Sequence, residues 1–413
     1  MKILLILDGI GDKACKALNE KTPLEAAHTP NLDALTKKGN NGYVYTVGKD
    51  IAPESDIAVL ALLGHDPKKV YTGRGPLEAY GAGIPFKNGN LALRTNFATT
   101  TTNMTLLDRR AGRTLTTKEA KELSEAINNK VKLEVPFKFI STVEHRGILV
   151  LQGQLSSNIS NVDPAYTKKG LFGVAGKKDN KRIQHCKALD SHAQTKNTAR
   201  LVNEFVKQSY HVLNNHLINQ KRKKNSLLPA NIILPRDAGT SLPVLPKKKG
   251  WTAIVNMPLE KGLASLSGMK IVEPKHYPVT DEDLYPVLYK NLRATIMTAK
   301  KTIKQRKTEN YYIHIKETDI PGHDNRPNDK VKMIEILDKE LFKFLKEINC
   351  ELVLTGDHST PCELKRHSSD PVPLLWVSKP KKDTVQRFTE KASLNGSLGK
   401  MIGKDVLSRT SFN

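Results

Sequence analysis

Acidic and histidine side chains gather in two short segments in the last quarter of the chain. Five residues of the types that bind metals in proteins lie there: Asp319, His323, Asp357, His358 and His367. Each segment begins just after an apolar, strand-like run, at residues 311–315 and 351–354. Side chains at the carboxyl ends of neighbouring parallel strands converge on one crevice. Mixed carboxylate and imidazole ligands suit Zn, Mn or Fe, so the pattern predicts a metalloenzyme.

Two residues near the other end of the sequence extend this prediction. Asp8 directly follows the apolar run at residues 3–7, which is typical of a parallel strand buried on both faces. Ser55 precedes the apolar helix predicted at 57–63, where free N–H groups favour an anion. A serine in that place is usually only a helix cap. The joint pattern nevertheless favours seven ligands divided between two cations, with Ser55 as an activated nucleophile.

Length and composition limit the classes of protein to consider. A chain of 413 residues is too long for one compact core, so we expect two domains. No apolar stretch approaches the ~20 residues that cross a bilayer, which argues against a membrane protein. The four cysteines show no CxxC spacing, and this favours a reducing cytoplasm over a disulfide framework or a zinc ribbon: Cys15, Cys186, Cys350 and Cys362.

The net charge of +24 raises the question of nucleic-acid binding. The charge is concentrated between residues 185 and 250, with basic clusters at 221–224 and 247–249. Both clusters adjoin turn-forming residues and lack the interleaved aromatic side chains of a base-stacking surface. We therefore interpret them as solvated loops, and nucleic acid is not the expected partner.

The order of the predicted elements indicates an interrupted domain. Strands and helices alternate in the first part of the chain and again after about residue 250, while the middle has a different character. The halves of the metal site lie at opposite ends of the sequence, so one domain must contain both ends. We predict an α/β domain with a mainly parallel sheet at 1–87 and 236–413, interrupted by an inserted α+β domain at 88–235.

Longer motifs carry a resemblance to a known family. They include LILDG at 5–9, KTPLEAA at 21–27, APESD at 52–56, YTGRGPLEA at 71–79, LRTNFAT at 93–99, DRRAGR at 108–113, DIPGH at 319–323 and TGDHSTP at 355–361. With these motifs the chain resembles the archaeal-type 2,3-bisphosphoglycerate-independent phosphoglycerate mutases of the alkaline phosphatase superfamily. The resemblance covers almost the whole chain and is weakest at about 165–250. It implies an alkaline-phosphatase-like three-layer core.

The resemblance also implies roles for individual residues. Ser55 would be the nucleophile that takes the phosphoryl group, and it would share one metal with Asp8, Asp357 and His358. The second metal would lie among Asp319, His323 and His367. Asp108 would be a proton shuttle, and the residues implied to bind substrate are Arg94, Arg109, Arg110, Arg113 and Lys261.

The implied reaction is the interconversion of 2-phosphoglycerate and 3-phosphoglycerate, a step of glycolysis and gluconeogenesis. It would use two divalent ions, with Mn expected and Zn, Co or Mg possible, and no bisphosphoglycerate. Glu54 departs from the family pattern, which usually has Gly beside the nucleophile. Two alternatives stay open: a related phosphotransferase or phosphomonoesterase resembling homoserine kinases, and a decayed homologue that binds polyanions. The sequence does not indicate an oligomeric state.

Overall fold

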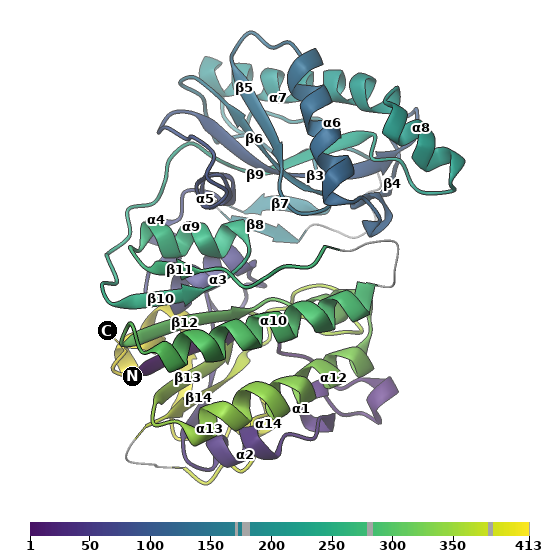
Figure 1. The fold of residues 1–413 in the computed structure, drawn as a ribbon. Coiled ribbons are helices and arrows are strands. Elements are labelled where there is room, and N and C mark those ends of the chain that lie inside the picture. The colour runs from purple at the N-terminus through teal and green to yellow at the C-terminus, as the bar shows by residue number, and fades with distance from the viewer. Residues whose placement is uncertain (170–171, 176–181, 279–283, 379–382, 413) are drawn as a thin grey trace. The chain divides into compact units, whose positions relative to one another are not determined.

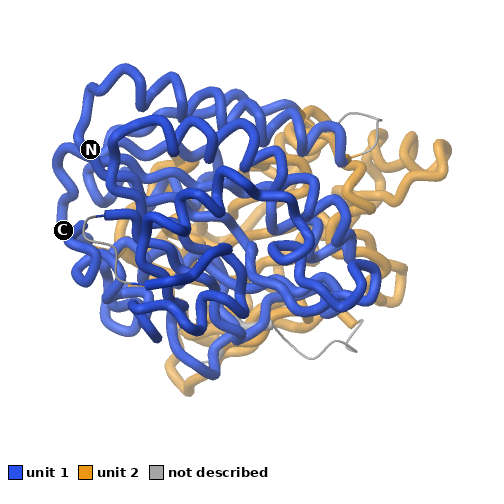
Figure 2. The backbone as a smooth tube through the Cα atoms, turned by 90° about the horizontal axis from the view of Figure 1, so that it is seen from below, with its two compact units in different colours: residues 1–70, 245–277, 285–413 blue, residues 71–244, 278–284 orange. Residues whose placement is uncertain are grey.

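The computed structural model describes residues 1–169, 172–175, 182–278, 284–378 and 383–412. The chain divides into two compact units (Figure 2). Unit 1 contains residues 1–70, 245–277 and 285–413, and unit 2 contains residues 71–244 and 278–284. The boundaries between the compact units fall after residues 70 and 244, whereas the domain boundaries predicted from the sequence fall after residues 87 and 235. The functional domains at 1–87 with 236–413 and at 88–235 stay a prediction.

An eight-stranded sheet forms the centre of unit 1 (Figure 1). Its strands, in spatial order, are β11 (Lys270–Val272), β10 (Trp251–Ile254), β12 (Asn310–Ile315), β1 (Lys2–Leu7), β13 (Glu351–Gly356), β14 (Val372–Val377), β2 (Asn40–Tyr45) and β15 (Gly399–Ile402). Only β14 runs antiparallel to its neighbours. The mainly parallel α/β sheet predicted from the sequence is therefore confirmed.

Strand β1 lies between two strands that come from the other end of the sequence. Leu7 is level with Ile315 of β12 on one side and with Gly356 of β13 on the other. Residues 3–7 are all buried, as expected for a strand covered on both faces. Because the three strands end level, the residues that follow them start from the same edge of the sheet.

Helices pack with this sheet in two groups that contact each other little. One group contains α1 (Pro23–Ala26), α2 (Pro30–Thr36), α12 (Pro327–Leu337), a π-helical turn at Asp338–Phe342 and α13 (Lys343–Glu347). The other contains α3 (Ser55–Leu62), α4 (Pro67–Val70), α9 (Pro258–Leu266) and α15 (Val406–Arg409). The described residues of this unit also form α10 (Leu284–Gln305), α11 (Ile320–Asp324), α14 (Glu390–Ser393) and short 3-10 helices at Lys16–Leu18 and Gly403–Asp405.

Unit 2 is built on an antiparallel sheet. Strand β3 (Leu91–Thr100) pairs with β4, β6 and β9, and β5 pairs with β6. The bounds of these partners are β4 (Leu106–Asp108), β5 (Phe137–Ser141), β6 (Arg146–Leu151) and β9 (Ile232–Gly239). Separately, β7 (Tyr166–Lys169) pairs antiparallel with β8 (Phe172–Ala175). The helices are α5 (Arg74–Gly81), α6 (Thr117–Lys130), α7 (Ala193–Asn214) and α8 (Leu217–Lys224). This is the expected α+β composition.

One interpretation of the basic clusters is wrong. Residues 221–224 are not a solvated loop but the last turn of α8, and Arg222 is buried. Its guanidinium donates to the carbonyl oxygens of Ala111, Thr114 and Leu228, and it pairs with Glu119 at 3.1 Å. The second cluster, at 247–249, does lie outside helices and strands. In the described part of the chain, no helix is long and apolar enough to cross a membrane.

Candidate active site

The predicted ligands of unit 1 meet at the carboxyl edge of its sheet. Asp8 follows β1, Asp319 lies four residues after β12, and Asp357 follows β13. Gly9 permits this approach because it has a φ of +58° and a Cβ on it would lie 2.4 Å from Asp319 Oδ1. Its N–H donates to Asp357 Oδ1 at 3.0 Å. The level ends of three strands thus produce the convergence that the sequence predicted.

The first group of ligand-type atoms contains Asp8, Asp357 and His358, all buried and all within 4.8 Å of one another. His358 Nε2 lies 3.2 Å from Asp8 Oδ1 and 3.4 Å from Asp357 Oδ2. The same nitrogen lies 3.2 Å from Ser55 Oγ, at the first residue of α3. The four residues predicted to share one cation therefore lie together.

The second group contains Asp319, His358 and His367. His323 adjoins it, with Nε2 at 3.2 Å from Asp319 Oδ2. The ring of His367 stacks on His358 with centroids 3.7 Å apart and lies 5.1 Å from the ring of His323. The structure thus brings all seven predicted ligands into one place, with His358 between the two groups.

The charges of this site depend strongly on one another. Burial would lower the pKa of His358, but Asp357 and Asp8 raise it to about 9. Burial and the neighbouring His358 lower the pKa of His367 to about 4. Burial works against the ionised form of Asp319, but the attraction of His323 outweighs it and lowers that pKa. Because several carboxylates lie close together in this largely buried site, their ionised forms need positive charge beside them.

Three nearby residues were missed by the sequence analysis. Lys316 forms ion pairs with Asp8 and, at 3.2 Å, with Glu260. His314 lies between the same two carboxylates, and with them it makes a third group of ligand-type atoms. Lys316 follows the predicted strand at 311–315 directly, so the strand-end argument could have found it. Glu260, inside α9, gave no such signal.

The donor atoms of the site fit divalent cations. Three buried carboxylate oxygens, Oδ1 and Oδ2 of Asp8 and Oδ2 of Asp357, accept no hydrogen bond from the described residues. Charged groups do lie within ion-pair distance of them. Buried carboxylate oxygens without hydrogen-bond partners are rare unless a cation or water satisfies them. Carboxylate and imidazole donors together suit Zn, Mn or Fe. Thr360 supports both groups, because its Oγ1 donates to Asp319 Oδ1 at 2.7 Å and lies 3.0 Å from His358 Nδ1.

The arginines predicted to bind substrate lie in unit 2, where several have protein partners. Arg109 makes a two-point contact with Asp163, at 2.8 and 2.6 Å. Arg94 lies 3.4 Å from Glu78, and burial lowers its pKa to about 10. Burial and then the charge of Arg113 lower the pKa of Arg110 to about 10 as well.

Two other predicted residues have structural contacts of their own. Asp108 Oδ1 accepts the N–H groups of Arg110 and Gly112 at 2.7 and 2.8 Å, so it holds the turn between the arginines. Lys261, in unit 1, pairs with Glu273 at 3.1 Å. These contacts leave the substrate-binding roles as predictions.

Fold and site together define an α/β protein with a buried carboxylate–imidazole site suited to divalent cations. Residues 36–219 match the family model of 2,3-bisphosphoglycerate-independent phosphoglycerate mutase. A relative with that name from Thermococcus kodakarensis is 38% identical over 98% of this chain and 95% of its own. The chain therefore belongs to the family of 2,3-bisphosphoglycerate-independent phosphoglycerate mutases.

Solved structures agree with this assignment. The cofactor-independent phosphoglycerate mutase from Thermoplasma acidophilum is 31% identical, with a TM-score of 0.57 over 99% of this chain and 98% of that one. A protein from Pyrococcus horikoshii is 28% identical, with a TM-score of 0.75 over 100% of this chain and 96% of that one. The family resemblance drawn from the sequence motifs is thereby confirmed.

Proposed function

We propose that this protein interconverts 2-phosphoglycerate and 3-phosphoglycerate through a phosphoserine at Ser55, without bisphosphoglycerate. The observation that carries the proposal is the placement of Ser55 Oγ 3.2 Å from His358 Nε2, a ring nitrogen that also lies beside the buried carboxylates of Asp8 and Asp357. The names of the relatives support the same reaction. A small phosphorylated acid as substrate agrees better with a compact group of carboxylate and imidazole ligands than a nucleic acid does.

Two divalent ions, with Mn as the first choice, would fit the donor set. Asp8, Ser55, Asp357 and His358 would hold one, and Asp319, His323 and His367 the other. When bound, such ions offset negative charge on the phosphoryl group and lower the pKa of a hydroxyl group beside them. Thr360 would orient both sets of ligands, since it contacts Asp319 and His358 at once.

The reaction is a double displacement in which the chain supplies the acceptor. Ser55 Oγ attacks phosphorus as its proton leaves, the bond to the glycerate oxygen breaks, and that oxygen takes up a proton. Glycerate then turns so that its other hydroxyl attacks the phosphoserine, and Ser55 recovers its proton. The start of α3 favours the negative charge on the phosphoryl group.

Arginines of unit 2 would bind the carboxylate and phosphate of the substrate. We assign this role to Arg94, Arg109, Arg110 and Arg113, with Lys261 beside the phosphate and Asp108 moving a proton. Arg109 is the weakest member of this set, because Asp163 already occupies its two-point face. We also infer a cytoplasmic location, which the four free cysteines support.

The test is an assay of 2-phosphoglycerate formation coupled to enolase, with chelator-treated protein and added Mn²⁺ but no bisphosphoglycerate. Parallel additions of Zn²⁺, Co²⁺ and Mg²⁺ identify the preferred ion. Ser55→Ala should lower turnover by about 10⁴-fold or more, whereas Ser408→Ala, on an exposed part of α15, should not change it. Ser55→Ala with wild-type turnover, or wild-type protein that only releases phosphate, would contradict the proposal.

A further inference from the structure

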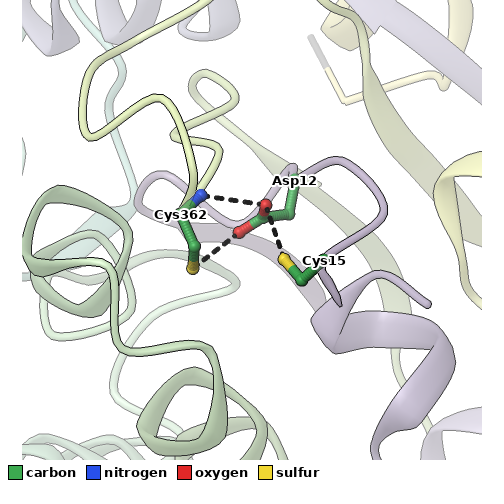
Figure 3. A group of neighbouring side chains, drawn as sticks. All are labelled: Asp12, Cys15 and Cys362. Atoms are coloured by element: carbon green, nitrogen blue, oxygen red, sulfur yellow. Dashed lines mark hydrogen bonds between the residues drawn. The ribbon is translucent and has the colours of Figure 1, made fainter. Parts of the chain in front are cut away.

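A fourth group of ligand-type side chains lies in unit 1, apart from the seven residues of the proposed active site. It contains Asp12, Cys15 and Cys362, whose ligand atoms all lie within 4.8 Å of one another. Figure 3 shows the Asp12 carboxylate between the two sulfur atoms, with Cys15 and Cys362 on different segments. The two cysteines are 1% and 0% exposed. No disulfide joins them, so both are thiols.

The Asp12 carboxylate is already fully bound by protein donors. Its Oδ1 accepts the N–H groups of Lys13 and Cys362 at 2.8 and 3.0 Å and faces Cys15 Sγ at 3.8 Å. Its Oδ2 accepts from Lys330 Nζ at 2.8 Å and from Cys362 Sγ at 3.1 Å. Five donors use the lone pairs of both oxygens, and the Lys330 ammonium supplies the positive charge. A metal ion would have to displace these groups, so the chemistry left to this cluster is that of its two thiols.

We propose that Cys15 and Cys362 are a redox-responsive dithiol that a hydroperoxide converts into an intramolecular disulfide. One thiol attacks the peroxide oxygen and becomes a sulfenic acid as water leaves. The second thiol attacks the sulfenic sulfur, the S–S bond forms, and a second water leaves. Two thiols and one hydrogen peroxide thus yield one disulfide and two waters, and a small-molecule dithiol reverses the change.

The neighbourhood of the two sulfurs fits this chemistry. The Sγ atoms of Cys15 and Cys362 lie within 4.8 Å of each other, so a short movement of the two side chains would bring them to the length of an S–S bond. Hydrogen bonding with Cys15, followed by burial, raises the pKa of the Cys362 thiol, so the reduced pair is stable until a small oxidant reaches it. Cys15 lies in a non-helical segment whose neighbours at 13, 14 and 16 are exposed, which gives hydrogen peroxide a short path.

The segment that carries Cys362 also carries Thr360. The Thr360 N–H donates to Gly11 O at 2.9 Å, while its hydroxyl supports Asp319 and His358. Forming the disulfide draws residue 362 toward residue 15 and removes its S–H bond to Asp12, which shifts this support. If the proposed mutase function holds, oxidation should lower mutase activity by about 10-fold or more, because the loss of a residue that supports metal ligands has an effect of this size.

The experiment treats full-length, metal-loaded protein with hydrogen peroxide, removes the excess, and counts thiols after denaturation. The count should fall from four to two, and non-reducing peptide mapping should find Cys15 joined to Cys362. Cys15→Ser and Cys362→Ser should each lack the cross-link, and the serine hydroxyl can replace the thiol as a donor to Asp12. Cys350→Ser is the matched control and should form the same cross-link. Four remaining thiols, or a bond between another pair, would overturn the proposal.

Mutase turnover is measured on the same samples before oxidation, after it, and after dithiothreitol. Wild type and Cys350→Ser should lose activity and recover it, while Cys15→Ser should keep its starting activity through all three steps. A cross-linked protein of unchanged turnover would overturn the effect on activity. A reduced protein without any turnover would refute the proposed function instead. The thiol count would still show whether Cys15 and Cys362 form a disulfide.

Discussion

Replacing Arg222 by methionine should destabilise unit 2 severely, although a basic residue in a run of four looks dispensable. Arg222 is 2% exposed and donates to three main-chain carbonyls, at distances from 3.0 to 3.3 Å, and to Thr114 Oγ1 at 2.7 Å. A buried group left without its partner costs about 1–3 kcal/mol. Glu119, 27% exposed, can return to water. The expected loss is therefore about 3–5 kcal/mol.

The measurement is the unfolding transition of unit 2, followed by calorimetry and assigned by limited proteolysis. In a unit of 150–250 residues each kcal/mol lowers Tm by about 2–4 °C, so Arg222→Met should lower it by about 6–20 °C. Lys223→Met is the matched control, because Lys223 is exposed on the same helix turn. Arg222→Lys should lie between the two, since an ammonium cannot reach all the acceptors of a guanidinium.

The same substitution should also change substrate binding. Arg222 donates to the carbonyl oxygens of Ala111, inside the turn between Arg110 and Arg113, and of Thr114, directly after it. Below its unfolding temperature, Arg222→Met should raise KM for phosphoglycerate more than it lowers kcat. A Tm within 2 °C of the Lys223→Met control would refute the reasoning, because it would mean that water replaces the guanidinium at little cost.

Two further predictions concern unit 1. Thr360→Val removes the contacts to Asp319 and His358 and should weaken Mn²⁺ binding by about 10–100-fold by titration calorimetry, while Thr360→Ser should bind nearly as wild type does. Equal affinities would contradict a supporting role. Burial raises the pKa of Glu390 from its usual 4.5 to about 7, so its ionisation destabilises the fold as pH rises through that interval. Glu390→Gln should therefore stabilise the protein against urea by up to about 3 kcal/mol at pH 8 and by less than about 1 kcal/mol at pH 5. Equal gains at both pH values would rule out this titration.

The sequence predicted those parts of the site that follow from local pattern. Apolar runs at 3–7, 311–315 and 351–354 became three adjacent strands, and the residues after them converged because parallel strands end at one edge. Ser55 was found because a polar residue before an apolar helix begins that helix. Asp319 with His323 and Asp357 with His358 were predicted as ligands from their residue types and spacing alone.

Residues whose burial depends on distant partners could not be predicted in the same way. Glu260 lies inside α9, and only its contacts with Lys316 and His314 show that it belongs to the site. Arg222 stands among solvated lysines, and only the carbonyls of residues 111 and 114 show why it is buried. Strand β14 was not predicted either; its neighbours, β13 and β2, lie far from each other in the sequence. In each case the deciding contact joins segments that local periodicity does not relate.

The place of β1 between β12 and β13 has a consequence for synthesis on the ribosome. Strand β1 is synthesised well before its two partners, β12 and β13, which lie between Asn310 and Gly356. At about 5–20 residues per second, β1 waits about 15–70 s for its neighbours, with an apolar segment exposed. Residues 71–244 of unit 2 are synthesised within this interval. Residues 3–7, which are buried in the folded protein, therefore cannot reach their final packing until the chain has been made as far as Gly356.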